Sequence, residues 1–155
     1  MDIAVLGGDA RVFREYLLSW ELWAGRGQGE LESKPITIES ISPECHVLWC
    51  RPSSTSDWAF EVLLNEAAGE EWLFRRDHRI RKPLSEIGSA AKNGIPHLKP
   101  ELVLLFKAKH NLDKDQHDFM AALPTLTPEA REWLSDSLQV VHPCHPWLVF
   151  LGTLG

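Results

Sequence analysis

Hydrophobic and polar positions alternate most clearly over 58–64, with the period of two that is typical of a β-strand. The clearest strand is predicted at 58–65, and a turn at 67–70 leads into a partner strand at 72–75, which together indicate a hairpin. Two further strands are predicted at 2–6 and 20–24. Shorter extended elements are expected at 47–50, 80–87 and 95–98.

Helical spacing of the hydrophobic residues is found over 10–19, after a Gly7-Gly8 turn, and then throughout the region that begins at Pro100. Pro100 is expected as a first helical residue, Asp113 opens the next helix, and Thr127 caps a third, with Pro128 as its first residue. A last helix or apolar tail is expected over 147–154. The side chains predicted to be buried together are Leu105, Phe106, Phe119, Met120, Trp133, Leu134 and Leu138.

Strands that precede helices along the chain indicate an α+β fold. We expect a small mixed β-sheet over 1–98 and a helical C-terminal region over 99–155, packed together as one unit. The 155 residues, 44% of them hydrophobic and 25% charged, are enough for a hydrophobic core.

A formal net charge of -6 argues against general binding of nucleic acid, which needs a basic surface. The sequence has neither an apolar run long enough to cross a membrane nor a signal-peptide pattern, and its three cysteines have no C-x-x-C spacing. These features predict a cytoplasmic protein with reduced thiols. They do not indicate an oligomeric state.

Two carboxylates lie within predicted strands. Glu61 shares a strand face with Ala59 and Leu63, opposite the predicted face of Trp58, Phe60, Val62 and Leu64. The alternation alone favours a carboxylate that faces solvent, and the alternative is one held for chemistry. Asp2 begins an apolar strand, where a polar first residue is also common for structural reasons alone.

A basic group and a His/Cys segment are further candidates. The basic residues could bind an anion such as a triphosphate, or could form a solvated surface. The segment 142–146 (His-Pro-Cys-His-Pro), with His46 and Cys50, matches no standard zinc spacing, and turns at its prolines explain it without metal. The basic residues are Arg75, Arg76, Arg79, Arg81, Lys82, Lys107 and Lys109.

Four segments together resemble signatures of one family. They are 60–66 (Phe-Glu-Val-Leu-Leu-Asn-Glu) followed by 71–77, 95–109 (from Ile-Pro-His-Leu-Lys-Pro-Glu to Leu-Leu-Phe-Lys-Ala-Lys), 114–119 (Lys-Asp-Gln-His-Asp-Phe) and 142–148. The chain is similar over nearly its whole length to proteins related to the aminoglycoside and lincosamide nucleotidyltransferases, within the DNA polymerase beta superfamily.

The resemblance implies an Mg-dependent enzyme with a nucleotidyltransferase-type sheet. It would move a nucleoside monophosphate from a nucleoside triphosphate, with ATP as the expected donor, to a hydroxyl of a small molecule, an antibiotic being one possible acceptor. In this family carboxylates hold the metal ions, which neutralise charge and align the reaction. By this resemblance Asp2 is a metal ligand, Glu61 is a metal ligand or general base, and Lys107 or Lys109 contacts phosphate.

The sequence departs from the family pattern at its start. Asp2 aligns with the second carboxylate of a D-x-D or D-x-E pair, so the first would precede Met1, together with the family's Gly-rich helix. The expectation is therefore an N-terminally truncated or degenerate relative with little or no activity as it stands. The alternative is a non-catalytic protein that binds a nucleotide or another ligand with the same fold.

Overall fold

The chain has an α+β fold, seen in the computed structural model, which describes residues 2–27, 30–31, 35–37, 41–42, 44–110 and 112–152. Its contacts divide it into two units, Met1–Arg75 and Arg76–Gly155. This division differs from the expected boundary between residues 98 and 99, because short strands after Arg75 belong to the same unit as the helices. Within the described residues no helix is both long and apolar enough to cross a membrane.

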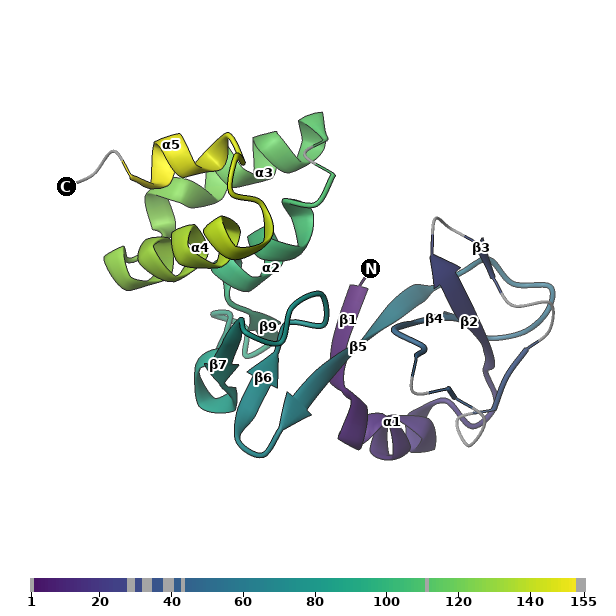
Figure 1. Ribbon diagram of the computed structural model, residues 1–155. Helices are drawn as coiled ribbons and strands as arrows, with labels where there is room; N and C mark the ends of the chain where they lie inside the picture. Colours follow the sequence, from purple (N-terminus) through teal and green to yellow (C-terminus); the bar gives the residue numbers. More distant parts are fainter. Residues whose placement is uncertain are drawn as a thin grey trace. The chain divides into compact units, whose positions relative to one another are not determined.

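The first unit is built on a mixed sheet (Figure 1). Its strands have the order β3-β2-β4-β5-β6, with antiparallel neighbours, and β1 pairs in parallel with β5. A parallel pair requires a long connection, and that connection here contains the helix α1 (Ala10–Tyr16). The strands are β1 (Asp2–Leu6), β2 (Glu21–Gly27), β3 (Glu30–Leu31), β4 (Val47–Arg51), β5 (Phe60–Ala68) and β6 (Glu71–Leu73).

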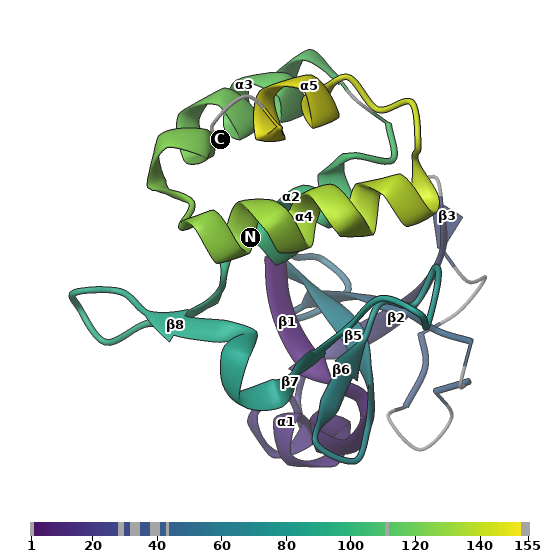
Figure 2. The same ribbon diagram turned by 60° about the vertical axis from the view of Figure 1, so that its left-hand side comes forward.

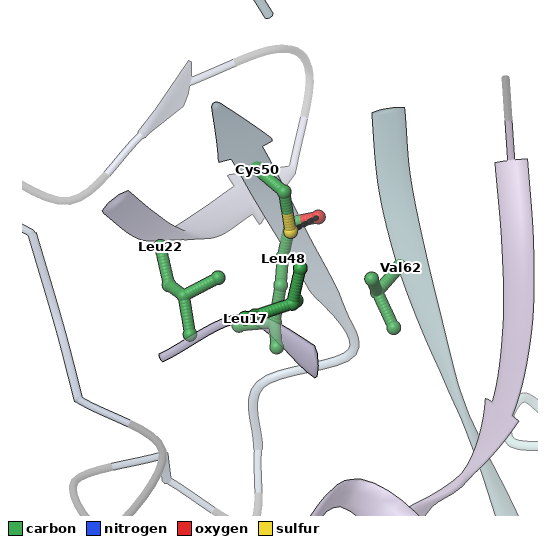
Figure 3. Close-up of a cluster of buried hydrophobic side chains, with 5 residues drawn as sticks. All are labelled: Leu17, Leu22, Leu48, Cys50 and Val62. Atoms are coloured by element: carbon green, nitrogen blue, oxygen red, sulfur yellow. Dashed lines mark hydrogen bonds between the residues drawn. The ribbon is translucent and has the colours of Figure 1, made fainter. Parts of the chain in front are cut away.

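The core of this unit lies on one face of the sheet (Figure 3). It contains Leu17, Leu22, Leu48, Cys50 and Val62, and Phe60 and Leu64 pack against it from β5. Phe60, Val62 and Leu64 thus lie on the core face, as the alternation predicts. The prediction is wrong for Trp58, which precedes the start of β5 and packs against Trp49 and Trp23 instead. Burial raises the pKa of the Cys50 thiol to about 12, so this cysteine stays protonated and acts as a small hydrophobic residue.

A buried polar contact fixes the β5–β6 hairpin. Trp72 is fully buried, and its indole N–H donates a hydrogen bond of 3.0 Å to the Asn65 side-chain oxygen. The Asn65 amide in turn donates to the Leu63 carbonyl at 3.0 Å. The turn between the strands contains Gly69 at φ +58°, a conformation that favours glycine.

The second unit is mainly helical (Figure 2). The helix α2 packs on α3 and α4, and α5 packs on α4. Short strands precede the helices, and two of them, β8 and β9, form a small antiparallel sheet. The elements are β7 (Arg81–Pro83), β8 (Gly88–Ala90), β9 (Pro96–Leu98), α2 (Pro100–Lys107), α3 (Asp113–Ala122), α4 (Pro128–Val141) and α5 (Trp147–Leu151).

The predicted helix starts are confirmed. Pro100 and Pro128 are first helical residues, and the Thr127 hydroxyl accepts a hydrogen bond of 3.2 Å from the Ala130 N–H. The helix expected over 10–19 ends earlier, at Tyr16. The last helix ends at Leu151, and residues 153–155 of the expected segment lie outside the described residues.

Most of the predicted helical core is confirmed, with one error. Phe119 stacks on Trp147 with 4.3 Å between ring centroids, whereas Met120 is 46% exposed. The inward face of α3 contains Asp115, Gln116 and Phe119, so the next position after Phe119 turns outward. Of the other predicted core residues, Leu105, Leu134 and Leu138 are buried, and Phe106 and Trp133 are half-buried.

A buried ion pair joins β7 to α2. The Lys82 ammonium lies 3.3 Å from a Glu101 carboxylate oxygen, and both side chains are at most 10% exposed. The same ammonium lies 4.7 Å from the centre of the Trp133 ring. Trp133 is therefore half-buried because it covers a cation rather than because it enters the hydrophobic core.

We predict that Lys82→Met destabilises the second unit by about 3–5 kcal/mol, because it leaves the Glu101 carboxylate buried without a counter-ion. The double variant Lys82→Met/Glu101→Leu is expected to recover most of that loss. Urea unfolding of the two variants and the native chain, followed by circular dichroism, measures both effects. Equal destabilisation by the single and double variants would contradict this role for the pair.

Candidate functional site

The two predicted site carboxylates are direct neighbours in the sheet of the first unit. Asp2 on β1 is the register partner of Glu61 on β5 in the parallel pair. Neighbouring strands are about 4.8 Å apart, so both residues project from adjacent points of one sheet. The two residues that the resemblance assigns to one metal site are thus neighbours in the sheet.

The environment of Glu61 favours its protonated form. Burial is the larger cause of its raised pKa, and the negative charge of Asp2 is the second. The side chain of Glu61 is half-buried, whereas Asp2 is exposed. A carboxyl group whose pKa is raised by a second carboxylate is suited to accept a proton or to share a cation with it.

The row that contains the two carboxylates continues into aromatic side chains. Across β5 and β4, Glu61 is the register partner of Trp49, and across β4 and β2, Trp49 is the partner of Trp23. All lie on the face opposite Leu48 and Val62, since successive side chains of a strand point to opposite faces. These indoles were not predicted as site residues, although Trp49 alternates with Leu48 and Cys50 in the sequence and so lies on the face opposite theirs.

Several of the predicted basic residues make ion pairs or hydrogen bonds within the second unit. Arg79 forms a 2.6 Å ion pair with Asp77, and its hydrogen bonds lower the pKa of that carboxyl to about 2. Arg76 donates to the Phe106 carbonyl at 3.1 Å, and Arg81 donates to the His78 carbonyl. These three arginines thus make contacts that stabilise the second unit.

The two lysines expected at phosphate differ in their surroundings. The Lys107 ammonium lies 2.8 Å from Asp118 and 3.5 Å from Asp115, and these carboxylates raise its pKa. Its charge is therefore already neutralised by α3. Lys109 lies just beyond the end of α2 and is exposed.

Within the described part of the chain, no group of three or more His, Cys, Asp or Glu side chains is placed to hold a metal ion. In the His/Cys segment 142–146 the ring of His145 is held by two hydrogen bonds, whereas Nε2 of His142 is buried without a hydrogen-bond partner. The Trp147 N–H donates to Nδ1 of His145 at 3.2 Å, which leaves the Nε2 hydrogen to bond the Ala108 carbonyl at 3.1 Å. Both ring nitrogens of His145 are thus used, and its geometry requires the neutral ring.

No protein-family model, curated protein or solved structure matches this chain. The family resemblance therefore rests on the sequence segments described above. The geometry of Asp2 and Glu61 is independent of that resemblance.

We predict that Asp2→Asn lowers the pKa of Glu61 toward, but not to, the ordinary value of a glutamic acid. Removing the neighbouring negative charge eliminates one cause of the raised pKa, while burial, the larger cause, remains. Carbon-13 NMR titration of the glutamate carboxyl groups measures the change. An unchanged Glu61 pKa would show that the two carboxyl groups do not interact.

The second unit is predicted to lose stability below about pH 6.5. Burial lowers the pKa of both His142 and His145, with the charge of Arg76 also acting on His142 and the charge of His142 on His145. The unfolded chain, with ordinary histidine pKa values near 6.5, then binds more protons than the native chain. The stability that the two neutral histidines contribute is therefore complete above pH 6.5, and it is lost as the pH falls toward their native pKa values.

The His145→Gln variant separates this effect from that of the other histidines. A glutamine supplies one acceptor and one donor without titrating, so its unfolding free energy should fall less between pH 7.5 and pH 5.5. Parallel acid dependence in the native chain and the variant would assign the effect to other groups. Urea unfolding at each pH is the measurement.

Proposed function

We propose that this chain is a nucleotidyltransferase-like protein that binds a nucleoside triphosphate with Mg²⁺ at Asp2 and Glu61. The observation that carries the proposal is the in-register placement of these two carboxylates on adjacent parallel strands. The raised pKa of Glu61 supports it, because the two groups are close enough to interact electrostatically. The family resemblance supplies the reaction class.

The donor set fits magnesium. Mg²⁺ is a hard cation that is bound in many nucleotide sites through one or two carboxylates plus the phosphates of the substrate, rather than by a complete protein cage. Asp2 and Glu61 supply those two carboxylates. When bound, the ion would neutralise charge on the triphosphate.

In the proposed reaction a hydroxyl oxygen of a small acceptor forms a bond to the α-phosphorus. The bond from that phosphorus to the bridging oxygen of the β-phosphate breaks, and pyrophosphate leaves with the electron pair. The acceptor proton passes to the carboxylate of Glu61, whose raised pKa makes it a better base than an ordinary glutamate. Asp2 lies beside it in the sheet and would hold the cation.

Lys107 and Lys109 both belong to the second unit, and the ammonium of Lys107 is already paired with Asp115 and Asp118, so the proposed site of the first unit rests on Asp2 and Glu61. The acceptor is proposed to be a small hydroxyl-bearing molecule, with aminoglycoside and lincosamide antibiotics as the first compounds to test. The free thiols of Cys45, Cys50 and Cys144 suit a cytoplasmic location.

A non-catalytic binding protein is the second candidate. Among the described residues two carboxylates meet at the site, and no third ligand joins them. Two-metal phosphoryl transfer needs more negative charge to hold both ions, so slow turnover or binding alone is expected.

We predict that the chain binds ATP only with Mg²⁺ present, and that Glu61→Gln weakens this binding about tenfold or more through loss of a charged contact. The matched control is Glu70→Gln, which changes an exposed carboxylate in the β5–β6 turn. Isothermal titration calorimetry measures binding. Pyrophosphate release with a panel of aminoglycosides and lincosamides measures turnover.

Mg-dependent binding without pyrophosphate release would favour the binding protein. Binding that is equally weakened by Glu61→Gln and Glu70→Gln, or that does not require Mg²⁺, would overturn the assignment of the site.

A further inference from the structure

Four neighbouring strands place two carboxylates and two indoles in one transverse row. The row runs from Asp2 on β1 through Glu61 on β5 and Trp49 on β4 to Trp23 on β2, each residue being the register partner of the next. The core occupies the opposite face of the same strands. Acidic and aromatic side chains therefore meet at the boundary between Glu61 and Trp49.

The indoles of this face are held in a fixed arrangement. The Trp58 ring is 5.7 Å from that of Trp49 and 6.2 Å from that of Trp23, nearly perpendicular to both, at 74° and 83°. The Arg51 guanidinium lies 4.7 Å from the Trp58 ring centre. A 2.7 Å ion pair with Glu21 anchors that guanidinium.

Trp49 differs from the other two indoles in its neighbours. The guanidinium lies over the rings of Trp58 and Trp23, whereas Trp49 is the indole next to Glu61. Trp49 is half-buried rather than buried. A flat, braced aromatic ring beside a pair of carboxylates is suited to stack a planar ligand that also carries a cation-bound group.

We propose that Trp49 is the stacking platform for the nucleobase of the triphosphate bound at Asp2 and Glu61. The proposal rests on the proposed function, which it extends from the phosphates to the base. Each strand step along the row is about 4.8 Å, so Trp49 lies one step from Glu61 and Trp23 two steps. A ribose separates the α-phosphate from the base, and one to two strand steps match that separation.

Stacking recognises the π-face of a base rather than its hydrogen-bonding edge. Trp49 therefore raises the affinity for the nucleoside part of the ligand and does not select one base over another. Trp58, Arg51 and Glu21 act as positioning residues because they hold the aromatic group in place.

The test compares two probes that share the phosphates and differ in the nucleoside. Mg-ATP and Mg-tripolyphosphate are titrated into the full chain by calorimetry, and the readout is the ratio of their dissociation constants. Trp49→Leu is expected to weaken ATP about fivefold or more while changing tripolyphosphate by about twofold at most. Trp49→Phe, which keeps a flat ring, should retain most of the native ratio.

Glu61→Gln is the complementary variant, and it should weaken both probes by a similar factor. Circular dichroism establishes that each variant folds. If Trp49→Leu does not fold, Trp49→Val, which also lacks the ring and suits a strand, supplies the readout. An unchanged ratio in Trp49→Leu, with both probes still bound, would overturn the platform and leave the carboxylate site intact. Absence of binding by both probes to the native chain would overturn the carboxylate site and the platform together.

Discussion

Parallel pairing of β1 with β5 is the contact on which the candidate site depends. It places Asp2, at the start of the chain, beside Glu61, about sixty positions later. The pairing forms because the apolar residues between and around the carboxylates, such as Val5 and Val62, pack on the core face. A shift of one residue in this register would move every side chain of β1 to the other face, so burial of the apolar set also fixes the carboxylates.

Glu61 illustrates how a sheet can hold an ionisable group. Its neighbours in the strand, Phe60 and Val62, pack toward the core, which orients the carboxyl group to the opposite face. There its neighbours across the strands are a carboxylate on one side and an indole on the other. Partial burial and like charge both disfavour ionisation, and these conditions distinguish Glu61 from a solvated surface glutamate.

Charges in the second unit mainly stabilise its own fold. Lys82 is buried against Glu101, and Lys107 is held between Asp115 and Asp118. A buried cation without a partner is costly, so the unit matches its cations with carboxylates from neighbouring elements. Three of the basic residues singled out in the sequence, Arg79, Lys82 and Lys107, thus form separate ion pairs.

Local signals in the sequence determined the fold class and the strands of the first unit other than β3. They also determined the helix starts at Pro100, Asp113 and Thr127, since capping acts between near neighbours. The sequence also indicated Asp2 and Glu61 as candidates. Only the tertiary structure decided that they are register partners, that Trp49 and Trp23 extend their row, and that Met120 faces outward. These outcomes depend on which strands pair and which helix faces meet, and such choices are made by burial of the whole apolar set rather than by any single segment.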